Sequence, residues 1–205
     1  MNGKEKIGKI REFVEEKLSF LHSNKNESAV RAELARLRRG IGKKPGELPE
    51  LWELLLDDFP TELESNGAER SKAEWAIYTA LTLFALHQQG KDIQREYMFQ
   101  ATNWEKKQYH GLGSAIGDLA KIQHDRKDAI KRRFYMAVTA ADLQGLSWHL
   151  RGIVQQLRGN NIPLDYSALA TELYWYQYPN KIPDIRLRWG QDFYRTVGAK
   201  GRQEE

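Results

Sequence analysis

Residues 69–90, ERSKAEWAIYTALTLFALHQQG, carry one long helical pattern that ends at Gly90. After Trp75 the apolar residues surround most of the helical circumference instead of forming one stripe, which is typical of a helix buried on all sides. The apolar part, residues 76–86, contains two threonines and is far shorter than the ~20 residues that a membrane-spanning helix needs. We therefore predict a central, buried helix and no membrane association.

Segments on both sides of this helix carry apolar residues at helical spacing. Before it, the stripe Val30, Leu34, Leu37 and Ile41 follows a potential N-cap at Ser28. Comparable patterns occupy residues 7–21, 112–122, 128–159, 166–177 and 185–197. The alternation in IRLRW, residues 185–189, is the one strand-like stretch, and it is too isolated to build a sheet.

These patterns predict an all-α fold with two packed helical bundles and no significant sheet. We place the N-terminal bundle at residues 1–115 and the C-terminal bundle at residues 116–205, and we expect the last few residues to be disordered. A chain of 205 residues with 40% hydrophobic and 29% charged residues has the composition of a folded, soluble protein. The absence of cysteine excludes disulfides and fits a cytoplasmic location. The N-terminus is charged from the start, so we expect no signal peptide.

The residues that enzymes use are not grouped in any recognisable pattern. No two of the five histidines are three or four residues apart, and there is no cysteine, so we predict no metal site. The stretch GLGSAIG, residues 111–117, resembles a phosphate loop but lacks the preceding strand and the lysine, and we favour a helix start with close helix packing. His87 is either catalytic or a helix-end histidine bonded to a neighbour, and we favour the second. We predict no enzyme activity and no cofactor.

Cations gather in three arginine-rich clusters, although the net charge is only +4. The planar guanidinium of arginine binds phosphate oxygens in a fork, so clustered arginines favour contacts to a nucleic-acid backbone. The alternative is a set of solvated helix faces whose charge is balanced by acids elsewhere. The candidate nucleic-acid-binding residues are Arg36, Arg38, Arg39, Lys43 and Lys44 in the first cluster, Lys131, Arg132 and Arg133 in the second, and Arg151 and Arg158 in the third.

Aromatic residues are concentrated in LYWYQYP, which contains Tyr174, Trp175, Tyr176 and Tyr178. Such side chains stack on nucleic-acid bases in some proteins, but at helical spacing they more often belong to a core or an interface. We favour core or interface for these four. The cationic clusters are then expected to recognise the backbone and shape of a nucleic acid rather than its base sequence.

Four stretches in this order resemble the CasB-type small subunit of the type I-E CRISPR Cascade complex. The resemblance runs from about residue 7 to residue 195, and the stretches are LARLRRGIGKKPGELPELW (34–52), AIYTALTLFALHQQG (76–90), HLRGIVQQLRGNNIPLDYSALATEL (149–173) and IRLRWGQDFY (185–194). The resemblance implies an all-α, non-enzymatic subunit of an RNA-guided surveillance complex. It also implies several partners: the backbone and large subunits of Cascade, a second copy of the chain, crRNA and target DNA.

The family often carries further basic residues along the helix that here reads LGSAIGDLA, where this chain has Ser114, Gly117 and Asp118. A second hypothesis is a free-standing helical protein that binds single- or double-stranded nucleic acid without partners. A third is a helical enzyme with an unrecognised site, which the absence of metal and nucleophile motifs disfavours. A fourth is a scaffold whose basic patches contact acidic protein surfaces.

Overall fold

The computed structural model describes residues 2–65, 67 and 69–198, and its regular structure is helical. The α-helices are α1 (Gly3–Ser23), α2 (Glu27–Arg39), α3 (Trp52–Leu56), α4 (Lys72–His87), α5 (Leu112–Ile122), α6 (Lys127–Val138), α7 (Leu143–Gly159), α8 (Tyr166–Tyr176) and α9 (Ile182–Gly198). Short 3-10 turns are η1 (Pro49–Leu51), η2 (Thr61–Leu63) and η3 (His124–Arg126). In the described residues, β-pairing is limited to isolated bridges, Phe99 with Leu164 and Asn103 with Gln108. The all-α prediction is confirmed.

Helix α4 lies at the centre of the molecule, as residues 69–90 predict. Ser71 begins it with a capping box, because its hydroxyl accepts from the Glu74 backbone while the Glu74 carboxylate accepts from the Ser71 backbone. Nearly every residue from Ala73 to His87 is buried. The helix ends at His87, and the chain turns away through Gly90, whose φ of 78° is in the left-handed region.

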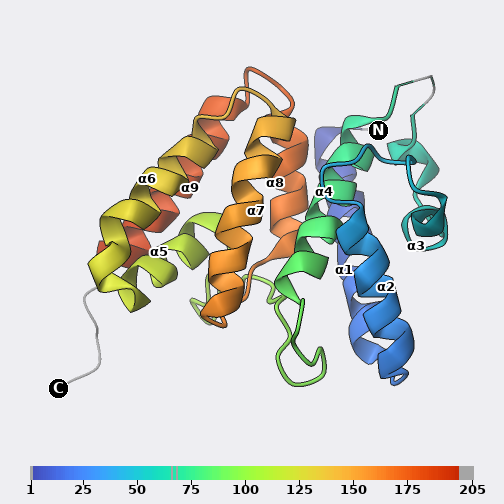
Figure 1. Cartoon of the computed structure of the whole chain (residues 1–205). Coiled ribbons are helices and arrows are strands. Elements are labelled where there is room, and N and C mark those ends of the chain that lie inside the picture. Colours follow the sequence, from blue (N-terminus) through green and yellow to red (C-terminus); the bar gives the residue numbers. More distant parts are fainter. Residues whose placement is uncertain (1, 66, 68, 199–205) are drawn as a thin grey trace.

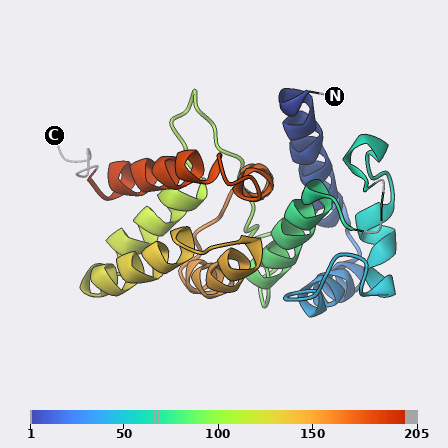
Figure 2. The same cartoon turned by 90° about the horizontal axis from the view of Figure 1, so that it is seen from above.

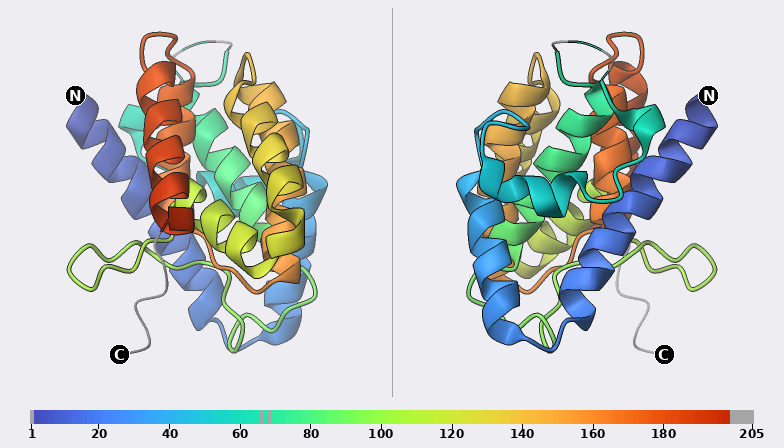
Figure 3. Two further views of the ribbon diagram at one scale, coloured as in Figure 1. Left: turned by 90° about the vertical axis from the view of Figure 1, so that its left-hand side faces the viewer. Right: turned by 90° about the vertical axis from the view of Figure 1, so that its right-hand side faces the viewer.

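The helices form three layers (Figures 1 and 2). Helices α6, α7 and α2 lie along one side of the molecule, and α9, α8 and α1 lie along the opposite side. Helices α4 and α5 occupy the space between them, and the two side views in Figure 3 show the same separation. The three cationic clusters of the sequence lie in or next to α2, α6 and α7, so this arrangement brings them to one side of the molecule.

One hydrophobic core runs through both halves of the chain. It extends from Ile10 in α1 to Phe193 in α9, and α4 packs against both α7 and α8. Residue 115, where we place the boundary between bundles, lies inside α5. The division at this residue remains a prediction, and the expected disorder of the last few residues concerns positions outside the described range.

Helices α5 and α9 pack closely because α5 presents small residues to α9. A Cβ on Gly113 would lie 2.2 Å from the Trp189 carbonyl oxygen, and one on Gly117 would lie 2.7 Å from Thr196 Cβ. This confirms that GLGSAIG is a helix start at a close packing site. Since Ser114 and Gly117 are buried there, basic residues at these two positions would not face solvent.

Candidate nucleic-acid interface

Arg38 and Arg158 come from different helices and converge on the C-terminal end of α4. The apolar stripe of α2 packs against α4 and places Arg38 Nη1 3.4 Å from the Ala85 carbonyl oxygen. From α7, Arg158 Nη1 lies 3.4 Å from the Leu86 carbonyl oxygen and donates to Gln89 Oε1 at 2.8 Å. The last carbonyls of a helix lack partners within the helix and form the negative end of its dipole, which attracts cations.

The two guanidinium groups are close enough to affect each other. Burial, with a smaller contribution from the positive charge of Arg158, lowers the pKa of Arg38. In the part of the chain that the structure describes, neither group forms an ion pair with a carboxylate. Their partners among the described residues are neutral carbonyl and amide oxygens, so both arginines keep their positive charge. Two adjacent guanidinium groups of this kind form a site that favours an anion such as phosphate.

The α6–α7 pair carries further cations on the same side of the molecule. Arg133 of α6 reaches toward α7, with Nη1 3.9 Å from where a Cβ on Gly152 would lie. Arg151 of α7 is exposed, and its Cζ lies 6.0 Å from the ring centroid of Trp148. Arg132 is exposed, and within the described residues no ion pair includes Arg132, Arg133 or Arg151.

Lys131 points away from this group. Its Nζ lies 5.5 Å from the ring centroids of both Tyr135 and Tyr194, on the flank of α6 that faces α9. The second cluster of the sequence is therefore divided between two flanks of α6.

In the first cluster, three of the candidate cations are paired with acids. Arg36 pairs within α2, whereas Arg39 and Lys43 pair with acids that follow Gly46 in the sequence. These pairs are Arg36–Glu33 (2.9 Å), Arg39–Glu50 (3.2 Å) and Lys43–Glu47 (2.8 Å). Among the described hydrogen bonds, Lys44 contacts Glu47 through its backbone alone: its N–H donates to the Glu47 carboxylate and its carbonyl oxygen accepts from the Glu47 N–H. The solvated-face alternative therefore describes much of this cluster, but not Arg38.

The aromatic and histidine candidates lie in the core or pack against it. Tyr174 and Tyr176 are buried, and the partly buried Trp175 and Tyr178 pack against Tyr174, so the prediction that these four belong to a core or an interface is confirmed. His87 is buried, and its Nδ1 lies 3.0 Å from the Tyr166 hydroxyl, as we expected for a helix-end histidine bonded to a neighbour.

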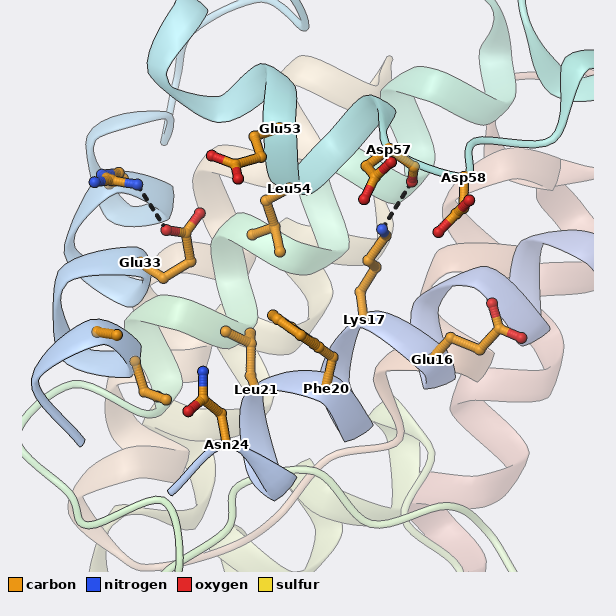
Figure 4. A pocket seen from close by; sticks show the side chains of 13 residues that line it. Glu16, Lys17, Phe20, Leu21, Asn24, Glu33, Glu53, Leu54, Asp57 and Asp58 are labelled. Carbon is orange, nitrogen blue, oxygen red and sulfur yellow. Dashed lines mark hydrogen bonds and ion pairs between the residues drawn. The ribbon is translucent and has the colours of Figure 1, made fainter. Parts of the chain in front are cut away.

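A groove of about 470 Å³ lies between α1, α2 and α3 (Figure 4). Apolar side chains including Phe20 and Leu54 lie between two groups of carboxylates in this view. The carboxylates are Glu33 and Glu53 on one side and Glu16, Asp57 and Asp58 on the other. Burial raises the pKa of Glu33. Five carboxylates against two cations, Lys17 and Arg36, repel phosphate, so this groove is not part of the candidate nucleic-acid interface.

Two other kinds of feature are absent from the described ranges. No helix there has the length and apolar character to cross a membrane. No group of three or more histidine, aspartate or glutamate side chains there is arranged to hold a metal ion.

Comparison with known proteins gives a consistent result. The family model for the CRISPR-associated protein Cse2 matches residues 33–194. The crystal structure of CasB from Thermobifida fusca is 31% identical with a TM-score of 0.72, covering 91% of this chain and 98% of that one. M. ruber CasB is 23% identical with a TM-score of 0.64, covering 91% and 94% of the two chains.

A chain from a structure described as a CRISPR RNA-guided surveillance complex is 19% identical with a TM-score of 0.67, covering 98% of this chain and 99% of that one. The comparison with curated protein sequences found no match. The family match covers most of the chain, and the helices that hold Arg38, Arg133, Arg151 and Arg158 lie within it or overlap it. This chain belongs to the Cse2 family of CRISPR-associated proteins.

Proposed function

We propose that this protein is a non-catalytic subunit of a CRISPR RNA-guided surveillance complex, where its α2, α6 and α7 side contacts nucleic-acid backbone and stabilises the R-loop. Membership of the Cse2 family and the likeness to a chain from a surveillance complex support the assembly role. The convergence of Arg38 and Arg158, without a carboxylate partner among the described residues, carries the nucleic-acid role. The proposed partners are the backbone and large subunits, a second copy of the chain, crRNA and target DNA.

Arginines that contact only backbone suit this role for an energetic reason. Exchange of a DNA duplex for an RNA–DNA hybrid is nearly balanced in free energy, so a few protein contacts to phosphates tip it. Base pairing with the guide supplies the sequence specificity, so the protein needs none of its own.

The assembly role is tested by purifying the tagged protein from its native cell, identifying its partners by mass spectrometry and sequencing any bound RNA. We expect several co-purifying subunits and a uniform, repeat-derived RNA. Recovery of the protein alone, or with heterogeneous nucleic acid, would instead favour the free-standing binder.

The nucleic-acid role predicts a large effect for Arg38→Glu combined with Arg158→Glu in the assembled complex. A hydrogen bond to a charged group is worth about 1.5–3 kcal/mol, so removal of two such hydrogen bonds should weaken target-DNA binding by at least about a hundredfold. The slope of log affinity against log salt concentration should also become shallower by about one for each phosphate that the protein no longer neutralises. Filter binding at several salt concentrations measures both quantities.

The matched control is Arg95→Glu combined with Arg195→Glu, which changes the net charge by the same amount. These two arginines lie outside α2, α6 and α7, and each pairs with an aspartate three residues earlier in the sequence. Circular dichroism of both variants should show that helical content is retained. Equal affinity and equal salt slope for the two double variants would contradict a phosphate site at Arg38 and Arg158.

A further inference from the structure

Trp148 is the most exposed of the large hydrophobic side chains within the described ranges, at 70%. It lies on α7, where Leu146 and Leu150 on either side of it are buried in the core. Its indole therefore contributes little to the packing of α7. A cation lies near the ring, since Arg151 Cζ is 6.0 Å from the ring centroid. This distance is at the outer limit of a cation–π interaction.

Trp148 begins a row of side chains along the outer face of α7. At 100° per residue, Trp148, Arg151, Gln155 and Arg158 fall within an arc of ~80° and span ~15 Å along the helix. Arg158 meets Arg38 of α2 at one end of the row, and Arg133 of α6 flanks it near Gly152. The row thus places one accessible aromatic ring in line with cations from three helices.

This combination suits single-stranded nucleic acid rather than a duplex. Proteins that bind single strands pair a cationic track for the backbone with aromatic rings on which bases stack. The bases of an intact duplex are already stacked on one another, so they have no free face for an indole. A base stacked on Trp148 would leave its strand running along α7, with Arg151, Arg158 and Arg38 positioned to bind its phosphates.

We infer that Trp148 is a stacking platform for a base of single-stranded nucleic acid whose backbone follows the arginines of α7 and α2. This inference rests on the proposed function, in which opening of the target duplex releases one strand. The ligand class is a single strand of any sequence, because every base offers a face for stacking.

The test uses the assembled complex and a target duplex that is already opened by mismatches. The displaced strand carries either normal nucleotides or abasic nucleotides of the same length and charge. Trp148→Ala should weaken binding of the normal substrate by about tenfold and leave binding of the abasic substrate unchanged. Trp148→Phe should retain most of the binding, because it keeps an aromatic face.

The control is Trp104→Ala, since Trp104 is 69% exposed and lies in the segment between α4 and α5 rather than on α7. An equal effect of Trp148→Ala on the normal and abasic substrates, or no effect on either, would overturn the inference. Failure of the Trp148→Ala variant to assemble would also overturn it, because a protein would then cover the ring.

The Arg38→Glu, Arg158→Glu variant separates this inference from the proposed function. If it weakens binding of both substrates while Trp148→Ala weakens neither, only the stacking platform is wrong. If the arginine variant also has no effect, the proposed nucleic-acid role itself fails.

Discussion

Replacement of Gly113 by alanine should lower the melting temperature by about 6–12 °C, which corresponds to about 3 kcal/mol for a chain of this length. The new Cβ would lie 2.2 Å from the Trp189 carbonyl oxygen and 2.9 Å from Asp192 Cβ. Neither the backbone carbonyl of α9 nor the buried start of α5 has space to yield, so the two helices must separate. Overpacking of this kind costs about 1–3 kcal/mol and occasionally more.

The same substitution at Gly190 serves as the control and should have the opposite sign. Gly190 lies inside α9, where a Cβ would meet nothing within 4 Å. Alanine is preferred to glycine in a helix by about 0.5–1 kcal/mol, so Gly190→Ala should raise the melting temperature by about 1–4 °C. Thermal unfolding followed by circular dichroism measures both. A Gly113→Ala protein as stable as the Gly190→Ala protein would show that α5 and α9 do not pack as closely as described.

Most of the helices can be predicted from the sequence because their apolar residues recur at helical spacing. The IRLRW segment, residues 185–189, is the one stretch whose short alternation also fits a strand. As a strand, residues 185, 187 and 189 would share one face, but in α9 Ile185 and Trp189 are buried while Leu187 is exposed. The spacing of four residues continues to Phe193, which is also buried, so the longer pattern outweighs the short alternation.

The candidate site is harder to predict from the sequence, because tertiary contacts decide which of its cations pair with an acid and which do not. Arg39 and Arg38 are adjacent in sequence, yet Arg39 pairs with Glu50 across a turn while Arg38 reaches α4. No local pattern distinguishes them, and none indicates that Arg158 lies next to Arg38. Trp148 could have been found from the sequence. It is a large apolar residue that lies outside the apolar stripe to which Leu146 and Leu150 belong, so its ring is expected to be exposed.

Two buried titratable groups, His87 and Glu172, should give opposite pH dependences of stability. Burial, with Lys91 and Arg158 nearby, lowers the pKa of His87 to about 3 from its ordinary 6.5. Below pH 6.5 the unfolded chain therefore binds a proton that the folded protein excludes. Stability falls as the pH falls toward 3, by about 1.4 kcal/mol per pH unit, or up to about 5 kcal/mol in all.

Glu172 acts in the other direction. Burial raises its pKa to about 7 from 4.5, although Arg188 at 3.1 Å and the Trp189 indole N–H at 2.7 Å favour the charged form. Nearby Asp165 and Asp192 raise it slightly further. Between pH 4.5 and 7 the folded protein holds a proton that the unfolded chain has released. The stability that this provides is present below pH 4.5 and is lost as the pH rises to 7, by about 3 kcal/mol.

Between pH 4.5 and 6.5 the two effects nearly cancel, so the wild-type protein conceals both of them. Glu172→Gln keeps an oxygen to accept from Trp189 but removes the titration, so its stability should rise by about 3 kcal/mol from pH 4.5 to 6.5 relative to the wild type. Urea unfolding at fixed ionic strength gives the difference curve, in which the contributions of all other carboxylates cancel. Adding His87→Asn to Glu172→Gln should remove most of the extra slope. Parallel curves for the wild type and Glu172→Gln would mean that the pKa of Glu172 is not raised in the folded protein, and that Arg188 and Trp189 offset the burial of its carboxylate.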